Sequence, residues 1–377
     1  PPSEKEWSIF WDRFHRRYTA FKESDDDVKT FVKEMNTVMG EVIRERDMAT
    51  RPRTGLAYWV ALTLFPLLLI VTYVLRGLFE RNPSPSINST PLRRVACFLL
   101  PALSVMLVFR LLPLCVAFAA SFTDLGAANI TNPSNSLFTG TGNYLRLYQD
   151  EIFWKSVKNT LVYLIVGVPI NMLIALTLAL AINRFRGWRR TLLASGLFLP
   201  SVITMVASAV TWRWLYCQQS PINIAINWLG FSPVNWLGNP DLALPSLIIF
   251  SVWRSYGLSM LIILAGLELI NRELYEAVRI DGGSTWNEFR HVTLPGLRGT
   301  LFAVAVGVVV ANIQFFIEPY VLTGGGPKDA TMSLLLFSYN RAFGSFQLGY
   351  ASSVITVLFV FFFVFNFWQR HFRRKLR

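Results

Sequence analysis

The chemistry open to this chain is indicated by a few polar side chains inside long apolar runs. Four positions in the run 244–270 recur at intervals of three and four residues, so they share one face of a helix. These are Ser251, Arg254, Ser255 and Leu258. Asn312 lies in the middle of a second run, 300–320. Polar groups in such runs are costly to bury and are candidates for function. The planar guanidinium of Arg254 suits oxyanions in particular.

Each of these side chains also has a structural explanation. Arg254 would extend its charge to the surface if it lay near the edge of an apolar layer. Asn312 could form an interhelical hydrogen bond worth roughly 1 kcal/mol. Glu318 and Gln314 are weaker candidates, and Arg213 between tryptophans fits an interface anchor. The sequence alone leaves both kinds of explanation open.

Signatures of an enzyme do not emerge from the sequence. No G-x-x-x-x-G-K-[S/T] phosphate loop occurs, so we expect no nucleotide to bind here in the usual way. The 3 histidines are scattered and the 3 cysteines show no paired spacing, which argues against a metal site or a disulfide framework. We therefore predict a non-catalytic protein with no cofactor of its own.

One polar stretch, Leu274–Pro295, separates two long apolar runs. Leu274–Ile280 has the pattern of a short amphipathic helix, and the Gly282–Gly283 pair should end it. Thr285 with Glu288 three residues later has the spacing of a capping box, which would start a second helix. The prediction is a helix, a glycine turn and a helix, stiff enough to transmit force.

The elements that must position these residues are membrane spans. The composition is 53% hydrophobic and 16% charged, and runs of about 20 apolar residues suffice to cross a bilayer as helices. We predict an all-α integral membrane protein with a six-helix core and at least one extra N-terminal transmembrane helix. The expected spans are Leu56–Phe79, Val95–Phe122, Val157–Ile182, Leu192–Tyr216, Leu244–Ile270, Thr300–Tyr320 and Gly349–Trp368.

The net charge of +13 is explained by its placement. Alternate connecting loops and the C-terminus carry 17 arginines and lysines, whereas the opposite loops carry 5. Positive charge marks the cytoplasmic side, which places Leu274–Pro295 there. No nucleic-acid partner is needed to account for the basic balance.

The predicted organisation has three parts. Residues 1–54 form a polar, helical N-terminal segment, residues 55–94 an extra transmembrane helix with a linker, and residues 95–377 the six-helix core with the loop 274–295. A single crossing at Leu56–Phe79 would leave residues 1–54 outside the cell. A further span before Pro1, or a hairpin at Pro66 that does not cross, would remove this difficulty, and the sequence does not decide between them.

The loop resembles the EAA loop of ATP-binding-cassette (ABC) importer permeases. That loop reads Glu-Ala-Ala, three residues, Gly, nine residues, Ile, one residue, Leu-Pro. The matching positions are Glu276, Ala277, Gly282, Leu294 and Pro295, while Val278 replaces the third Ala and Val292 the Ile. The resemblance implies a coupling helix that seats in a groove of a separate ATPase subunit.

From Cys97 onward the chain is similar to the larger sugar-permease subunit of the maltose-transporter type. The similarity is carried by the ordered phrases FLLP (98–101), SFTD (121–124), GNY (142–144), NTL (159–161), FLP (198–200), WRWL (212–215), NWLG (235–238), LTGGGP (322–327), Ala342-Phe343 and GYA (349–351). It implies a subunit of an ATP-driven importer of a sugar, oligosaccharide or sugar derivative in a bacterial or archaeal plasma (inner) membrane. The implied partners are a second permease subunit, two ATPase subunits that bind ATP and Mg, and an extracytoplasmic substrate-binding protein.

The same resemblance implies that Asn312 contacts the sugar. Ser251 stands where that subunit has an Asn, whereas Arg254 and Ser255 replace an aliphatic residue and a Gly. An arginine here could hold a uronate, a phosphate or a pair of hydroxyls. The sugar's identity therefore stays open.

Two other functions compete with a sugar permease. An ABC permease for a non-sugar solute would share the EAA loop but not the flanking phrases. A secondary transporter should show inverted repeats with broken helices and intramembrane acids, and the sequence shows no such pair.

Overall fold

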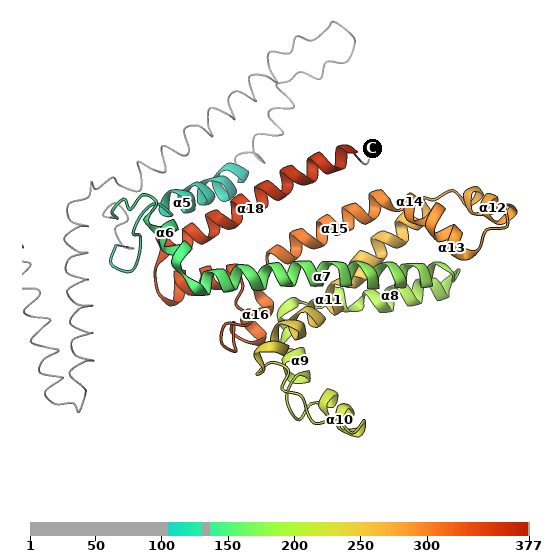
Figure 1. Ribbon diagram of the computed structural model, residues 1–377, viewed down its shortest axis with the longest axis horizontal. Helices are drawn as coiled ribbons and strands as arrows, with labels where there is room; N and C mark the ends of the chain where they lie inside the picture. Colours follow the sequence, from blue (N-terminus) through green and yellow to red (C-terminus); the bar gives the residue numbers. More distant parts are fainter. Residues whose placement is uncertain (1–104, 130–135, 376–377) are drawn as a thin grey trace, which may run out of the picture. The chain divides into compact units, whose positions relative to one another are not determined.

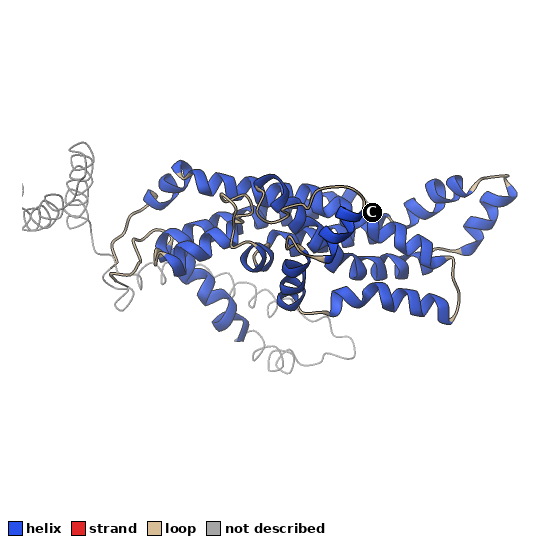
Figure 2. Ribbon diagram, turned by 90° about the horizontal axis from the view of Figure 1, so that it is seen from below, coloured by secondary structure: helices blue, strands red, loops and turns tan. Residues whose placement is uncertain are grey.

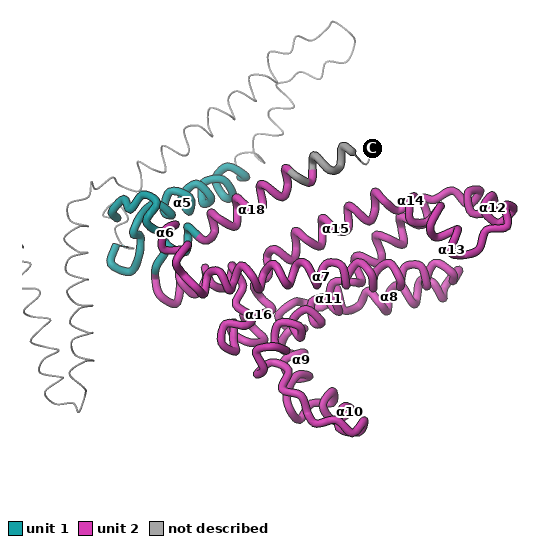
Figure 3. The backbone as a smooth tube through the Cα atoms, in the orientation of Figure 1, with its two compact units in different colours: residues 1–143, 347–353 teal, residues 144–346, 354–377 magenta. Residues whose placement is uncertain are grey.

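The computed structural model describes residues 105–129 and 136–375. Regular structure within these ranges is helical, apart from one isolated bridge between Thr123 and Phe138. The predicted span Leu56–Phe79, the segment 1–54 and the start of the span Val95–Phe122 lie outside the described residues. The chain divides into two compact units, residues 1–143 with 347–353, and residues 144–346 with 354–377 (Figure 3).

In the first unit, the π-helical turn η1 (Leu107–Leu111) leads into α5 (Leu112–Ala120). The loop after α5 is closed by Asn143, whose amide nitrogen Nδ2 donates to the carbonyls of Ser121 (2.9 Å) and Thr123 (2.8 Å). The amide of Gly349 donates to the Leu125 carbonyl at 2.7 Å. Segments more than 200 residues apart in the chain therefore close on one another here.

Further helices follow α5 along the described residues. In order they are α6 (Gly142–Gln149), α7 (Glu151–Asn183), α8 (Trp188–Val202), α9 (Met205–Leu215), α10 (Pro221–Trp228), α11 (Pro240–Glu268), α12 (Arg272–Ile280), α13 (Thr285–Glu288), η3 (Phe289–Thr293), α14 (Leu294–Gly296), α15 (Arg298–Ile313), α16 (Ile317–Leu322), α17 (Leu334–Tyr339), η4 (Asn340–Gly344) and α18 (Leu348–Lys375). The two longest core helices start on side-chain caps, Asp150 for α7 and Asn239 for α11.

Helix α11 is the centre of the second unit and packs against α7, α8 and α15 (Figure 1). Helices joined by loops make up the part of the chain that the structure describes (Figure 2). Two separate apolar clusters hold these helices together. One contains Ala175, Ala179, Ile182, Met260, Ile263, Leu264, Leu267, Leu297, Val304 and Val308. The other contains Tyr163, Ala209, Leu244, Leu247, Ile248, Phe250, Val252, Phe315 and Leu322. The first cluster lies at the C-terminal ends of α7 and α11 and along α15, which are the helix ends next to α12 and α13. The second cluster lies in the N-terminal halves of α7 and α11 and includes residues of α9 and α16.

Three predicted spans are confirmed as continuous helices. Val157–Ile182 lies within α7, Leu244–Ile270 corresponds to α11, and Gly349–Trp368 lies within α18. Each of these helices is long and apolar enough to cross a membrane. Of the span predicted at Val95–Phe122, the described part forms the shorter apolar helix Leu107–Ala120.

Two predicted spans are wrong as continuous helices. Leu192–Tyr216 breaks into α8 and α9 with a bend of 91°, at a run of β-branched residues, Val202, Ile203 and Thr204, that favours extended backbone. Thr300–Tyr320 ends as a helix at Ile313 and resumes as α16 at Ile317. Pro319 has no N–H to offer the Phe315 carbonyl, so a continuous helix would lose that bond and meet a steric clash.

Candidate functional site

The loop 274–295 forms two helices that stand beyond the turn between α7 and α8, at one end of the bundle (Figure 1). We refer to residues 271–297 as the hairpin. Asn271 caps the first helix, α12, by accepting a hydrogen bond from the Glu273 amide at 3.1 Å. The second arm runs through α13, η3 and α14 from Thr285 to Gly296 and meets α15 at a bend of 64°. The predicted helix, glycine turn and helix are confirmed.

Both glycines of the turn are required, for different reasons. Gly282 has φ +76°, a left-handed conformation that side chains resist. Its amide donates to the Arg279 carbonyl (3.0 Å) and that of Gly283 to the Val278 carbonyl (2.8 Å), which together end α12 in a Schellman motif. A Cβ on Gly283 would lie 2.5 Å from Val278 Cγ1. Val278, which replaces the third Ala of the signature, therefore fills the space beside Gly283.

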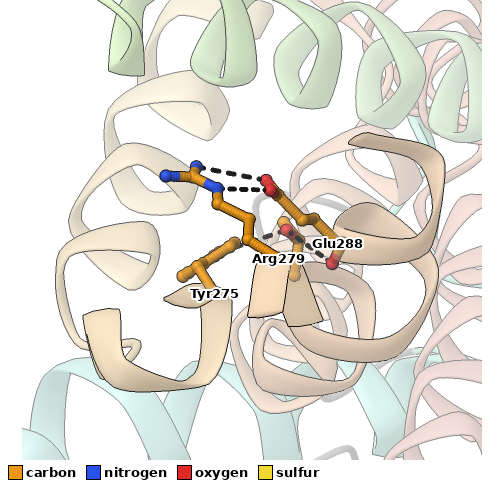
Figure 4. A network of polar contacts seen from close by, with 4 residues as sticks. Tyr275, Arg279 and Glu288 are labelled. Atoms are coloured by element: carbon orange, nitrogen blue, oxygen red, sulfur yellow. Dashed lines mark hydrogen bonds and ion pairs between the residues drawn. The ribbon is translucent and has the colours of Figure 1, made fainter. Parts of the chain in front are cut away.

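The predicted capping box is wrong. Ser284 occupies the cap position of α13, its side chain makes no capping hydrogen bond, and Thr285 is the first helical residue. The Glu288 carboxylate instead binds Arg279, with Nε to Oε1 at 2.7 Å and Nη2 to Oε2 at 3.5 Å (Figure 4). These hydrogen bonds raise the pKa of Arg279 above its ordinary value. A charged partner on the other arm outcompetes the local backbone amide.

The signature residues occupy two parts of the hairpin. Glu276, Ala277 and Gly282 are exposed on α12 and its turn. Leu294 and Pro295 lie at the base of the second arm, where Leu294 is 37% exposed and Pro295 is half-buried. The structure therefore does not bring all five residues onto one surface.

Large apolar side chains are also exposed on the hairpin. Leu274 is 53% exposed, Ile280 85% and Trp286 64%. Apolar groups exposed together and rimmed by charge are typical of an interaction surface. Glu276 and Ala277 lie on the same exposed helix.

A polar layer separates the two apolar clusters of the bundle. Asn171 on α7 is 1% exposed; its Nδ2 donates to Ser255 Oγ at 2.8 Å, and its Oδ1 accepts from Ser259 Oγ at 2.9 Å. Sequence analysis missed Asn171 and Ser259. Their signal was a polar residue within each apolar run, but the pairing joins positions 84 and 88 residues apart.

Four of the predicted substrate-path residues lie at or near this layer. Ser251 is 8% exposed, Arg254 and Ser255 are half-buried, and Leu258 is 54% exposed on the same helical face. Asn312 is half-buried one residue before the end of α15, and not mid-helix as expected. Among the described residues, neither the Arg254 guanidinium nor the Asn312 amide group has a hydrogen-bond partner. An interhelical bond of Asn312 is therefore not found there.

One helix break packs against α11 at Arg254, and the other packs against α7 at Tyr163. Ser201, near the end of α8, donates through Oγ to the Arg254 carbonyl at 2.8 Å. At the other break, Phe315 stacks on Tyr163 with ring centroids 3.7 Å apart. Broken helices at this depth are typical of solute sites in membrane proteins, because freed backbone groups line a cavity or are buried in protein.

Glu318 has a larger structural role than the sequence suggested. It is 5% exposed, and its Oε1 accepts a hydrogen bond from the Tyr163 hydroxyl at 3.1 Å. The Arg254 charge also acts on it electrostatically. Arg213, expected as an interface anchor, donates to the Val321 carbonyl at 3.3 Å and so links α9 to α16.

Comparison with known families decides the identity of this bundle. Residues 159–377 match the family described as binding-protein-dependent transport system inner membrane component. The chain belongs to this family. It is therefore a membrane-embedded, non-catalytic permease component of an ABC importer that depends on a binding protein.

Relatives of the permease share most of their length with it. It is 32% identical over 289 residues to the lactose transport system permease protein LacF of Rhizobium radiobacter, covering 74% of this chain and 93% of LacF. It is 35% identical over 265 residues to the trehalose/maltose transport system permease protein MalF of Thermococcus litoralis, covering 70% and 88%. A crystal structure of a bacterial ABC transporter involved in the import of the acidic polysaccharide alginate shares the fold, with a TM-score of 0.61 at 21% identity over 74% of this chain and 95% of that one.

Proposed function

We propose that this permease forms the path for a sugar, oligosaccharide or sugar derivative and is driven by a separate ATPase through the hairpin. The exposed α12, with Glu276, Ala277 and Ile280 on its surface, is the observation that carries the coupling role. Two ATPase subunits would bind ATP and Mg, and a second permease subunit would complete the path as a heterodimer. The host membrane would be bacterial or archaeal.

The sugar assignment is supported by the relatives and by the polar layer. LacF and MalF are named for lactose and for trehalose and maltose. Asn312 and Arg254 are half-buried and have free hydrogen-bonding groups among the described residues. Hydroxyl-rich solutes need several such groups, because leaving their own hydroxyls unpaired on desolvation costs free energy.

The substrate path proposed here comprises Asn312, Ser251, Arg254, Ser255 and Leu258. Ser255 is already bound to Asn171, so it would act by holding the layer together while Arg254 and Asn312 remain available. The exposed end of this face at Leu258 would be covered by the second permease subunit.

Expression of the permease with its genomic neighbours tests the proposal. We expect an ATPase subunit and a second permease to copurify, and vesicles containing all three with a binding protein to take up a labelled sugar only with ATP. Glu276→Lys should abolish uptake while the permease remains in the membrane. Accumulation of solute by the isolated chain in vesicles, with no ATPase present, would contradict the proposal.

A further inference from the structure

The arms of the hairpin are held together by very little apolar burial. Helix α12 has 9 residues and α13 only 4, and neither contains a buried residue, while η3 in the second arm contributes one buried apolar side chain, Val292. Helices this short are marginal in water without packing. Something other than a core must therefore fix the angle between the arms.

Side chains on one face of α12 provide this connection. Tyr275, Val278 and Arg279 are spaced at three and four residues and point toward the second arm. The Tyr275 hydroxyl lies 3.1 Å from Thr293 Oγ1, and Thr293 is 5% exposed. Arg279 binds Glu288 through two nitrogens, and only 14% of the Glu288 side chain is exposed.

The contact face proposed for the ATPase lies on the other side of the same helix. Glu276, Ala277 and Ile280 point away from the second arm and are exposed. The Glu288 carboxylate is largely covered and already paired with Arg279, so it is poorly placed to bind another protein. One side of α12 is thus available to another protein, and the other side holds the two arms of the hairpin together.

We infer that Arg279 and Glu288 are positioning residues that lock the two arms of the hairpin at a fixed angle, so that force applied to α12 reaches α15. The inference rests on the coupling role proposed above. It assigns the pair to the side of α12 that meets the second arm, where 65% of the Arg279 side chain is exposed and 14% of the Glu288 side chain, and not to the ATPase contact face. The hydrogen bond between Tyr275 and Thr293 is a second link between the arms, closer to α15.

The first experiment measures the arms directly. Spin labels at Leu274→Cys and Trp286→Cys, both exposed positions, would be introduced into the full-length permease purified without the ATPase, after Cys97, Cys115 and Cys217 are replaced by serine or alanine. The ATPase is left out because both labelled positions belong to the apolar surface that it would contact. Arg279→Glu and Glu288→Arg should each broaden the distribution of distances between the two labels. The fraction of molecules at the distance seen with the intact ion pair should fall about twofold to fivefold. The double charge swap should narrow it again. The control is Arg290→Glu, since Arg290 is exposed and has no ion-pair partner among the described residues.

The second experiment measures coupling in the same charge variants of the assembled complex, without the spin labels and without the changes at Leu274 and Trp286. ATP hydrolysis and maltose or lactose uptake by the reconstituted complex should become less tightly coupled in each single variant, recover in the double swap and remain normal in Arg290→Glu. Unchanged distances in the single variants, a double swap no better than either single variant, or altered distances with normal coupling would each overturn the inference. Glu276→Lys separates the two proposals: full coupling in that variant contradicts the coupling role itself, whatever the distances show.

Discussion

At the scale of single residues, the hairpin turn distinguishes two adjacent glycines. A side chain at Gly282 meets open space but needs a left-handed backbone, whereas a side chain at Gly283 meets Val278. The first is a conformational cost of about 1 kcal/mol, which Asn or Asp reduces. The second is a steric overlap with the Val278 side chain and with its carbonyl oxygen, and only a shift of the backbone relieves the contact with the oxygen.

This difference predicts that Gly283→Ala harms coupling more than Gly282→Asn. Val278→Ala should partly rescue Gly283→Ala, since it removes the Cγ1 contact at 2.5 Å but leaves the Val278 carbonyl at 2.8 Å. ATP-driven uptake in vesicles is the measurement. The control is Gly299→Ala, because Gly299 starts α15 with nothing within 4 Å. Equal activity of both glycine variants would show that the packing against Val278 does not matter.

The two asparagines of the bundle should respond in opposite ways. Asn171→Ala removes two interhelical hydrogen bonds and should lower stability by about 1–2 kcal/mol. Asn312→Ala removes none within the described residues, so it should lower uptake while the thermal stability of the complex stays unchanged. Both quantities are measurable on the same purified complex. A drop in stability with normal uptake for Asn312→Ala would assign that residue a structural role.

At the scale of elements, the break between α15 and α16 depends on one buried carboxylate. Glu318 accepts a hydrogen bond from Tyr163, and Tyr163 stacks on Phe315 within the break. This ties the start of α16 to α7. The Glu318 carboxylate also accepts backbone hydrogen bonds, and a buried acceptor that loses one of its donors still loses free energy of stabilisation.

Tyr163→Phe should therefore destabilise the permease by roughly 1–3 kcal/mol although it removes a single oxygen. The matched control is Tyr148→Phe, because Tyr148 is 73% exposed and its hydroxyl has no partner among the described residues. Thermal unfolding in detergent compares the two. The same melting temperature for both variants would mean that Glu318 needs no donor from α7.

Hydropathy predicted the existence of the helices better than their continuity. Long apolar runs identify α7, α11 and α18 because a helix satisfies its own backbone in an apolar layer. The breaks at Ile203 and Gln314 depend on β-branched residues and on Pro319, which weaken a helix without interrupting its hydropathy. A local pattern likewise predicted the hairpin, but it did not predict that Glu288 would bind the Arg279 side chain and form no capping box with Thr285.

At the scale of the whole molecule, several phrases that carried the family resemblance form contacts within a unit. In the first unit, Ser121 and Thr123 of SFTD accept hydrogen bonds from Asn143 of GNY. In the second, Nδ2 of Asn159 in NTL donates to the Asp329 and Met332 carbonyls, which fixes the segment after LTGGGP against α7. The spacing of such phrases predicted the family, but long-range pairing between them could not be derived from spacing alone.

Gly349 shows how tight one of these contacts is. A Cβ there would lie 2.1 Å from the Thr123 carbonyl oxygen and 3.1 Å from the Ala120 oxygen. Gly349→Ala should therefore reduce the amount of folded permease in the membrane several-fold, since backbone atoms cannot move aside as a side chain can. Gly344→Ala, with nothing within 4 Å, should accumulate normally. Immunoblots of membrane fractions compare the two, and equal amounts would contradict the tight contact.

The layer formed by Asn171, Ser255 and Ser259 has a mechanical consequence. Amides and hydroxyls can exchange one hydrogen-bond partner for another, including water or a solute, at little net cost. Separating an apolar cluster costs more free energy, because it exposes apolar surface to water. We therefore expect α7 and α11 to separate most readily at this polar layer, while the apolar clusters on either side of it stay packed.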